Sequence, residues 1–274
     1  HIIPNKADEE RGFCERDSFF FEAASPRKVG DVYYLIYSPR RGSRLAYATS
    51  DRPTGPFTYR GYIIDNGVDY PGGNDHGSIA CIRGQWYIFY HRMTNNSVFS
   101  RRACVEKIRI LPDGTIPAVE MTSLGFEEAL SPYREIPADI ACVLKGGAFV
   151  TEKSVFERVI TGITESCVIG YKYFDFGEDY SSRTMEFAAM INGCGCESTL
   201  HIHIDSEEGE EIGSCAVGSC DGVASGVVKN VTGRHVVFFR VSTGYHGDPG
   251  SSDWIGGFFA GRMLFELRAF VFMK

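Results

Sequence analysis

Two stretches of the chain repeat one another, and their spacing narrows the choice of fold. The segment that starts at Glu22, EAASPRKVGDVYYLIYS, aligns without a gap with the segment that starts at Asp75, DHGSIACIRGQWYIFYH, at an offset of 53 residues (75 minus 22). In this alignment Tyr37 falls on Tyr90. A β-rich repeat of roughly 40–50 residues is typical of a propeller blade of about four strands. The repeat therefore predicts two blades over roughly residues 22–125.

The repeat also predicts which polar residues meet near the propeller axis. The first strand of each blade lines that axis, and Glu22 occupies the blade position of the Asp75–His76 pair. A shared polar funnel would explain why a carboxylate follows three phenylalanines, since an unpaired charge is costly among apolar groups. Closed propellers have about four to eight blades, so we expect about three further blades N-terminal to His1.

A second group of strand-like segments follows the repeat. Residues 148–274 contain short runs of β-branched and aromatic residues separated by Gly-rich turns, which is typical of one β-sandwich. Residues 137–147 have the character of a linker, which leaves 1–136 for the blades. The sequence therefore predicts an all-β chain: a partial β-propeller of about two blades, a linker and a jelly-roll-like sandwich.

Composition excludes several classes of partner. The net charge is −7 and no basic stripe is present, so we expect no nucleic acid. No apolar run approaches the roughly 20 residues that span a bilayer, so we expect no membrane insertion. The nine scattered cysteines favour a reducing compartment, the cytoplasm, over secretion. Because the first residue is His1 and not methionine, a missing signal peptide carries little weight.

Four segments of the first half carry a resemblance to a known family. They are FFEAASPRKVGDVYYLIYS, LAYATSDRPTGPFTYRG, NDHGSIACIRGQWYIFYHR and SRRACVEKIRILPDGTIPAVEMTSLG. In this order they resemble the second half of the catalytic domain of glycoside hydrolase family 43, five-bladed propellers that act mostly on xylosides and arabinosides of plant cell walls. Residues 148–274 resemble, more loosely, the family 6 type of carbohydrate-binding sandwich that follows the propeller in many members. The resemblance implies an inverting glycosidase with an oligo- or polysaccharide substrate.

The resemblance assigns roles to three residues. Glu22 matches the general acid of the family, and Arg101 matches an arginine that contacts the sugar. His76 matches a histidine that holds a metal, often calcium and usually through water, at the propeller centre. No organic cofactor is implied. The general base and the aspartate that orients the acid have no matching motif here, so we expect the 274-residue chain alone to be inactive.

Each of these residues also has a structural interpretation. Glu22 could form a structural ion pair, and His76 could be a hydrogen-bonded core histidine. A single imidazole cannot hold calcium, which prefers oxygen ligands. Arg101 and Arg102 are neighbours on an expected strand and point to opposite faces, so only one lines a site, and we favour Arg101.

The whole chain has a rival interpretation as a non-catalytic carbohydrate-binding protein. In that case the sandwich carries the function, with Tyr245 and Trp254 as candidate contacts to sugar. The sequence does not select among xylose, arabinose and galactose. A zinc site is disfavoured, because the spacings C-x-C and C-x4-C are not those of zinc knuckles. The residues concerned are Cys194, Cys196, His201, His203, Cys215 and Cys220.

Overall fold

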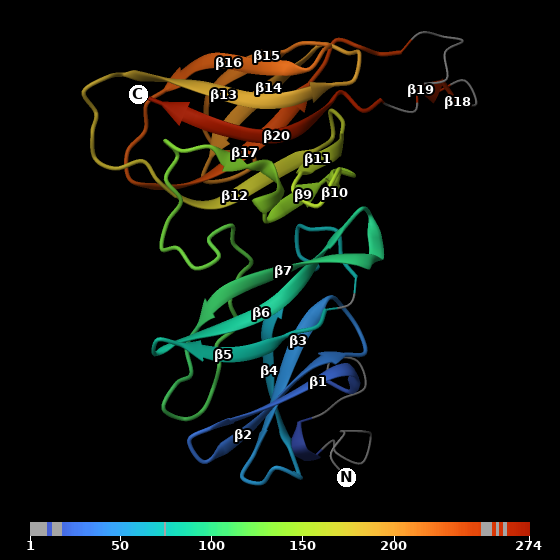
Figure 1. Ribbon diagram of the computed structural model, residues 1–274, viewed down its shortest axis with the longest axis vertical. Coiled ribbons are helices and arrows are strands. Elements are labelled where there is room, and N and C mark those ends of the chain that lie inside the picture. Colours follow the sequence, from blue (N-terminus) through green and yellow to red (C-terminus); the bar gives the residue numbers. More distant parts are fainter. Residues whose placement is uncertain (1–9, 13–17, 74, 248–253, 256–257, 260–261) are drawn as a thin grey trace. The chain divides into compact units, whose positions relative to one another are not determined.

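The structure of the protein is a computed structural model. It describes residues 10–12, 18–73, 75–247 and 262–274, and the backbone of 254–255 and 258–259. The chain divides into two compact units: His1–Met93 with Ser97–Met121, and Thr94–Asn96 with Thr122–Lys274. Both units are built from β-strands and loops (Figure 1). The expected all-β class is confirmed.

The first unit begins with a four-stranded antiparallel sheet in the order β1-β2-β3-β4. Its strands are β1 (Phe20–Val29), β2 (Val32–Pro39), β3 (Arg44–Ser50) and β4 (Thr58–Asp65). The central strands β2 and β3 are buried along most of their length, as their apolar sequences predict. Phe19, Leu35, Tyr37, Ala46 and Phe57 belong to one core cluster on this sheet. This is the first blade expected from the repeat.

A second sheet follows, with three strands in the order β5-β6-β7. They are β5 (Ser78–Ile82), β6 (Gln85–Thr94) and β7 (Ser97–Ile108). The repeat predicted about four strands, but residues 109–121 form no strand and run along the first sheet, where the Tyr34 hydroxyl donates to the Gly114 carbonyl at 2.8 Å. Pro112 and Pro117 explain the difference, because proline has no N–H to donate to a neighbouring strand.

The second unit is a β-sandwich of two sheets. One has the order β10-β11-β20-β13-β16 with β8 paired to β20, and the other has the order β15-β14-β17-β12-β9. The first sheet contains β8 (Ile136–Pro137), β10 (Phe149–Glu152), β11 (Arg158–Ile163), β13 (Thr184–Gly193), β16 (Gly222–Lys229) and β20 (Phe265–Met273). The second contains β9 (Val143–Lys145), β12 (Val168–Asp175), β14 (Ser198–Ile204), β15 (Glu211–Val217) and β17 (Arg234–Ser242). A separate short ribbon pairs β18 (Trp254–Ile255) with β19 (Phe258–Phe259).

Aromatic rings fill the space between the two sheets of the sandwich. Phe270 of β20 lies at its centre, with ring centroids 4.8 Å from both Tyr171 of β12 and Phe239 of β17. Phe187 of β13 packs on the same group at 5.6 Å from Phe239. These four side chains are fully buried and join strands from both sheets. They account for the strong apolar and aromatic character of the segments that predicted the sandwich.

The residues expected to form a linker, 137–147, contain regular structure. They include a 3-10 turn, η2 (Ala138–Ile140), and β9, which pairs with β12, while β8 beside them pairs with β20. The compact units divide near residue 121. The sequence PADIACVLKGG does not show this, because strands of two and three residues are too short to have a visible alternation.

Two further expectations concern composition. Among the described residues, no helix is long and apolar enough to cross a membrane. The eight described cysteines are free thiols. Cys14 lies outside the described residues.

Candidate active site

Glu22 lies near the start of β1, where the strand pairing is irregular. It faces Ser38 of β2, and the register shifts on both sides of this pair. Ala23 has a φ of 62°, in the left-handed region that side chains other than glycine seldom adopt. Such bulges re-aim a side chain and are common beside active sites. The Glu22 side chain is about one-third exposed as a result of this placement.

His76 precedes β5 and reaches Glu22. Its Nε2 lies 3.0 Å from Glu22 Oε1, and both side chains are partly exposed. The chain can pass here because residue 77 is glycine: a Cβ on Gly77 would lie 2.3 Å from Leu45 Cδ1 and 2.4 Å from the Phe89 carbonyl oxygen. Any side chain at 77 would push this segment away from its position. The close approach therefore helps to hold His76 against Glu22.

Arg27 joins the two strands that carry this pair. It lies on β1, and its Nε donates to the carbonyl of Ile79 on β5 at 3.0 Å. Its Nη2 donates to the Ser78 hydroxyl at 2.7 Å. Because Glu22 is on β1 and His76 immediately precedes β5, this fork fixes the distance between the strands on which the Glu22–His76 contact depends.

Asp75 and His91 lie behind the pair in a buried position. The Asp75 side chain is fully buried, and its Oδ1 accepts a hydrogen bond of 3.3 Å from the backbone N–H of His91. Burial raises the pKa of Asp75 to about 8, against the opposing effect of backbone hydrogen bonds and Arg92. Burial lowers the pKa of His91 to about 4, and the charges of Arg101 and His76 lower it further.

These shifts make both groups neutral near pH 7. The 4.0 Å approach of His91 Nε2 to Asp75 Oδ1 is therefore not an ion pair at that pH. The His91 ring instead meets His76 edge-on, with the centroids 5.6 Å apart. His76 thus lies between the Glu22 carboxyl group and a buried, uncharged imidazole, which restricts the orientation of its ring.

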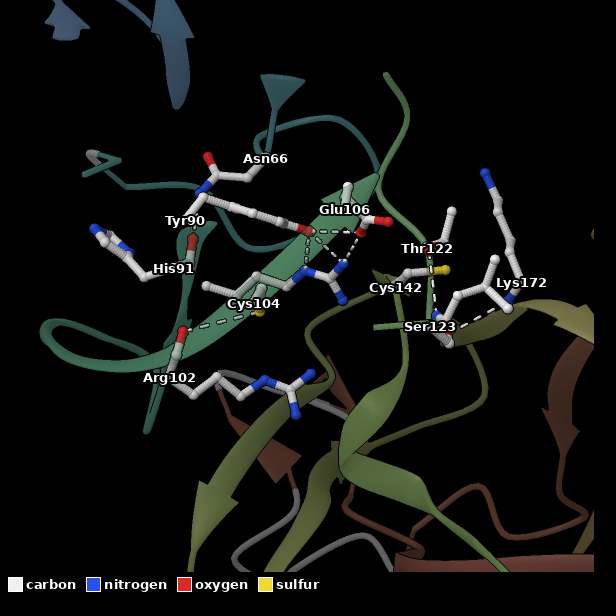
Figure 2. Close-up of polar contacts among 12 residues, drawn as sticks. Asn66, Tyr90, His91, Arg102, Cys104, Glu106, Thr122, Ser123, Cys142 and Lys172 are labelled. Atoms are coloured by element: carbon white, nitrogen blue, oxygen red, sulfur yellow. Dashed lines mark hydrogen bonds and ion pairs between the residues drawn. The ribbon is translucent and has the colours of Figure 1, made fainter. Parts of the chain in front are cut away.

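The opposite face of β6 carries a buried polar network (Figure 2). The Tyr90 hydroxyl donates to Glu106 Oε1 at 3.1 Å, and Arg92 Nη2 lies 3.4 Å from the same oxygen. Asn66 Nδ2 donates to the His91 carbonyl at 2.6 Å. Figure 2 shows the His91 side chain pointing away from Tyr90 and Glu106, as the alternation of a strand requires. The network fixes the end of β6 on which His91 sits.

Arg101 lies on β7 and is exposed. Its Nε donates to the Val98 carbonyl at 2.9 Å, and its charge acts on His91. Arg101 and Arg102 are neighbours on β7, so their side chains point to opposite faces of the strand. The structure thus brings Glu22 and His76 into contact, and the charge of Arg101 acts on the neighbouring histidine, His91.

The residues near His76 do not form a calcium site by themselves. No group of three His, Cys, Asp or Glu side chains among the described residues is arranged to hold a metal. Calcium takes about six to eight oxygen ligands, and His76 supplies one nitrogen that already contacts Glu22. A calcium contact of His76 through water, which the resemblance implies, stays a prediction, and we derive no chemical step through a metal.

The histidines of the disfavoured zinc site have other partners. His201 contacts Glu211 Oε1 through Nδ1 at 3.0 Å and Ser242 Oγ through Nε2 at 2.7 Å. His203 Nδ1 lies 3.0 Å from the Gly209 carbonyl oxygen. These contacts connect neighbouring strands and loops of the sandwich.

Sequence reasoning missed the contacts of Arg27 and Glu106. A signal for His91 exists in the repeat: adding 53 to Glu22 and to Ser38 gives Asp75 and His91. Glu22 and Ser38 are strand partners in the first sheet, and Asp75 and His91 are hydrogen-bonded in the second. The repeat therefore places a carboxyl residue opposite a polar residue twice. Arg27 and Glu106 have no such signal.

The chain is similar to characterised glycosidases. It is 44% identical over 212 residues to a "Xylosidase/arabinosidase" of Thermoclostridium stercorarium, a match that covers 64% of this chain and 44% of that protein. It is 28% identical over 252 residues to an "Arabinoxylan arabinofuranohydrolase" of Bacillus subtilis (strain 168), covering 81% of this chain and 48% of that protein. The chain therefore spans less than half the length of these curated relatives. No protein-family model matches it.

A solved structure supports the fold. It is a glycoside hydrolase family 43 arabinoxylan arabinofuranohydrolase from Bacillus subtilis in complex with cellotetraose, which matches with a TM-score of 0.53 at 23% identity. The match covers 93% of this chain and 54% of that chain. At this identity it shows the fold alone. Together with the sequence relatives, it confirms the expected resemblance to family 43.

Proposed function

Because the chain is a relative of the xylosidases and arabinosidases of glycoside hydrolase family 43, we propose that it forms the acid side of the active site of a glycosidase. The substrates are xylosides or arabinosides of plant cell-wall polysaccharide, and the hydrolysis inverts the anomeric configuration. The contact between Glu22 and His76 carries this proposal. The two side chains are 54 positions apart (76 minus 22), and His76 is the neighbour of Asp75, the residue that the repeat aligns with Glu22.

Glu22 is the general acid in this proposal. An inverting glycosidase needs a protonated carboxyl group beside the leaving oxygen and a base about 6.5–9.5 Å away that activates water. The imidazole of His76 holds Oε1 of Glu22 and so fixes the direction in which the carboxyl group points. Protonation of the departing oxygen by Glu22 and attack of water on the anomeric carbon complete the reaction.

Arg101 binds the sugar in this proposal. The residue is exposed, its charge acts on His91, and its guanidinium carries five N–H donors that suit sugar hydroxyl groups. Its place on a neighbouring strand lets it hold the substrate without competing with Glu22 for the leaving oxygen.

The base is the part of the reaction that this sequence does not supply. The two aspartates that the family resemblance requires have no matching motif here, so the base comes from other propeller blades in this proposal. The sandwich acts as a carbohydrate-binding module that holds the polysaccharide. The guanidinium of Arg262 lies over the ring of Tyr245, one of the two candidate sugar contacts, at 5.7 Å from the ring centroid. The side chain of the other candidate, Trp254, lies outside the described residues.

Hydrolysis of 4-nitrophenyl β-xyloside and α-L-arabinofuranoside tests this proposal. The 274-residue chain alone should give negligible turnover, because general base catalysis contributes about 10²–10⁴-fold. The same chain joined to propeller blades that carry the two aspartates should release nitrophenol, and proton NMR of the sugar product should show the inverted anomer first. Failure of the joined protein to turn over either substrate, with sugar binding intact, would support the rival function of a non-catalytic carbohydrate-binding protein.

A further inference from the structure

Phe99 on β7 is almost entirely exposed. Its side chain is 93% accessible, although most of the large apolar side chains of the chain are buried. The backbone N–H of Phe99 donates to the Ser97 hydroxyl at 3.2 Å, so the start of the strand is held in a defined turn. Because a single exposed apolar side chain is common on protein surfaces, the position of Phe99 and not its exposure alone relates it to a ligand.

The position of Phe99 relates it to the candidate active site. Phe99 and Arg101 are two residues apart on β7 and therefore lie on the same face of the strand. Arg101 acts electrostatically on His91, whose ring meets that of His76. His76 in turn contacts Glu22. Phe99 thus shares a face with the residues that lead to the proposed general acid.

We propose that Phe99 is an aromatic platform on which a sugar ring of the oligosaccharide substrate stacks. This inference rests on the proposed function and adds to it a subsite for an uncharged pentose residue. A pentose ring has C–H groups on its faces and hydroxyl groups at its rim. Phe99 offers an apolar surface to the face of the ring, while Arg101, one step along the same face, donates hydrogen bonds to the rim.

The combination selects for neutral sugar chains over other ligands. An exposed aromatic ring beside a single arginine suits a ligand that is apolar on one surface and rich in acceptors at its edge. A ligand with no apolar face gains nothing from the ring. A purely apolar ligand would gain nothing from the N–H donors of Arg101.

Fluorine NMR on the full chain tests the proposal with xylotetraose as the probe. The protein is labelled with 4-fluorophenylalanine, and the resonances of Phe99 and Phe156 are assigned from their loss in Phe99→Leu and Phe156→Leu. Phe156 is the matched control, because it is 97% exposed and lies in the β10–β11 turn of the other unit. The Phe99 resonance should shift with increasing xylotetraose while the Phe156 resonance stays in place.

The affinity for xylotetraose should depend on the side chain at position 99. Phe99→Ala should weaken xylotetraose binding by about three- to tenfold, the effect of losing one aromatic contact, whereas Phe99→Trp should retain the affinity. For the Ala variant, binding is followed on Phe21, whose side chain is 57% exposed and adjoins Glu22. Because the Phe99 ring is exposed, these variants keep the fold, which an unchanged spectrum of the other phenylalanines verifies.

The proposal is overturned if xylotetraose leaves the Phe99 resonance unmoved, or if Phe99→Ala and Phe156→Ala bind it equally well. This outcome is distinct from failure of the proposed function. A shift at Phe99, together with a Glu22→Gln variant that stays fully active in a form with a complete propeller, would retain the platform and reject the acid. An unmoved Phe99, together with loss of activity on Glu22→Gln in that complete form, would do the reverse.

Discussion

The Nε2 atom of His76 lies 3.0 Å from Oε1 of Glu22, and this contact connects the two sheets of the first unit. It forms because the two strands concerned are held side by side and because Gly77 lets the chain pass close to Leu45. A carboxyl group and an imidazole at this distance share a hydrogen bond whenever one of the two facing atoms carries a proton. In the proposed reaction, this pair contains the general acid.

Arg27 should be the residue that keeps β1 and β5 together. Replacing Arg27 by Ala removes its bonds to Ile79 and Ser78, and the local opening of the two strands should become easier by about 1 kcal/mol. Hydrogen exchange of the amides in β1 and β5 should then be roughly fivefold faster. Arg41→Ala, which changes an exposed arginine in the β2–β3 turn, is the control and should leave exchange unchanged. Equal exchange in the two variants would remove Arg27 from this role.

The buried pair of Arg92 and Glu106 should be sensitive to the loss of one partner. Their side chains are only 3% and 6% exposed, so Glu106→Gln leaves a guanidinium charge buried without its carboxylate. We expect a loss of about 3–5 kcal/mol in the free energy of unfolding, measured with urea. The double variant Arg92→Met/Glu106→Leu should recover most of it, since no charge is then buried. A double variant as unstable as the single one would show that packing, and not charge, sets the cost.

Surface pairs provide the control for this measurement. Lys229 and Glu210 approach within 2.5 Å, but both side chains are half exposed. Glu210→Gln should therefore produce no measurable change in the urea midpoint, because exposed ion pairs contribute little.

Asp75 should make stability fall as the pH rises. Burial raises its pKa in the folded protein to about 8, above the value of 3.8 for a free aspartate. The folded state therefore binds a proton that the unfolded state has lost, and stability from this group is full below about pH 4 and lost as the pH rises to about 8. Relative to Asp75→Asn, the wild type should lose stability over this range in urea unfolding experiments.

Asp113 offers a control of the opposite sign. Hydrogen bonds from Thr115 lower the pKa of this exposed carboxyl group. The wild type should therefore lose stability relative to Asp113→Asn only as the pH falls below about 4, where the carboxylate becomes protonated. For Asp75 itself, the contradicting result is a free energy of unfolding that changes with pH in the same way in Asp75→Asn and in the wild type from pH 4 to 8. It would mean that Asp75 is ionised in the folded protein.

The aromatic core of the sandwich should carry much of its stability. Phe270 is fully buried among rings from both sheets, and Phe270→Ala should reduce the free energy of unfolding by about 3–5 kcal/mol. Phe156→Ala removes the same side chain from an exposed turn and should change it by less than about 0.5 kcal/mol. Comparable losses in the two variants would contradict the assignment of the core.

Local patterns in the sequence predicted the strands, and the repeat predicted that Glu22 and His76 lie near one another. The offset between Glu22 and Asp75 was sufficient to place two distant polar segments together, because each blade repeats the same pairing. What the sequence did not show depends on tertiary contacts. Pro112 and Pro117 end the second sheet early, and β9 has three residues that become a strand only through β12.

The missed residues have the same explanation. Arg27 and Glu106 occur in strands with ordinary alternation, and nothing in their local sequence distinguishes them from solvated charges. Their roles follow from partners on other strands: Ser78 and Ile79 for Arg27, and Tyr90 and Arg92 for Glu106.

The most direct test of the account is the response of Glu22→Gln to the leaving group. The measurement compares kcat/KM for xylobiose and for 2,4-dinitrophenyl β-xyloside, in a form of the protein that carries a complete propeller. Glutamine keeps the shape of the side chain and removes the proton that Glu22 donates. A sugar is a poor leaving group that needs this proton, so its rate should fall by about 10²–10⁴-fold, while dinitrophenolate departs without help and should lose far less. Equal losses on the two substrates would contradict the account, because they would mean that Glu22 positions the substrate or supports the fold and is not the acid.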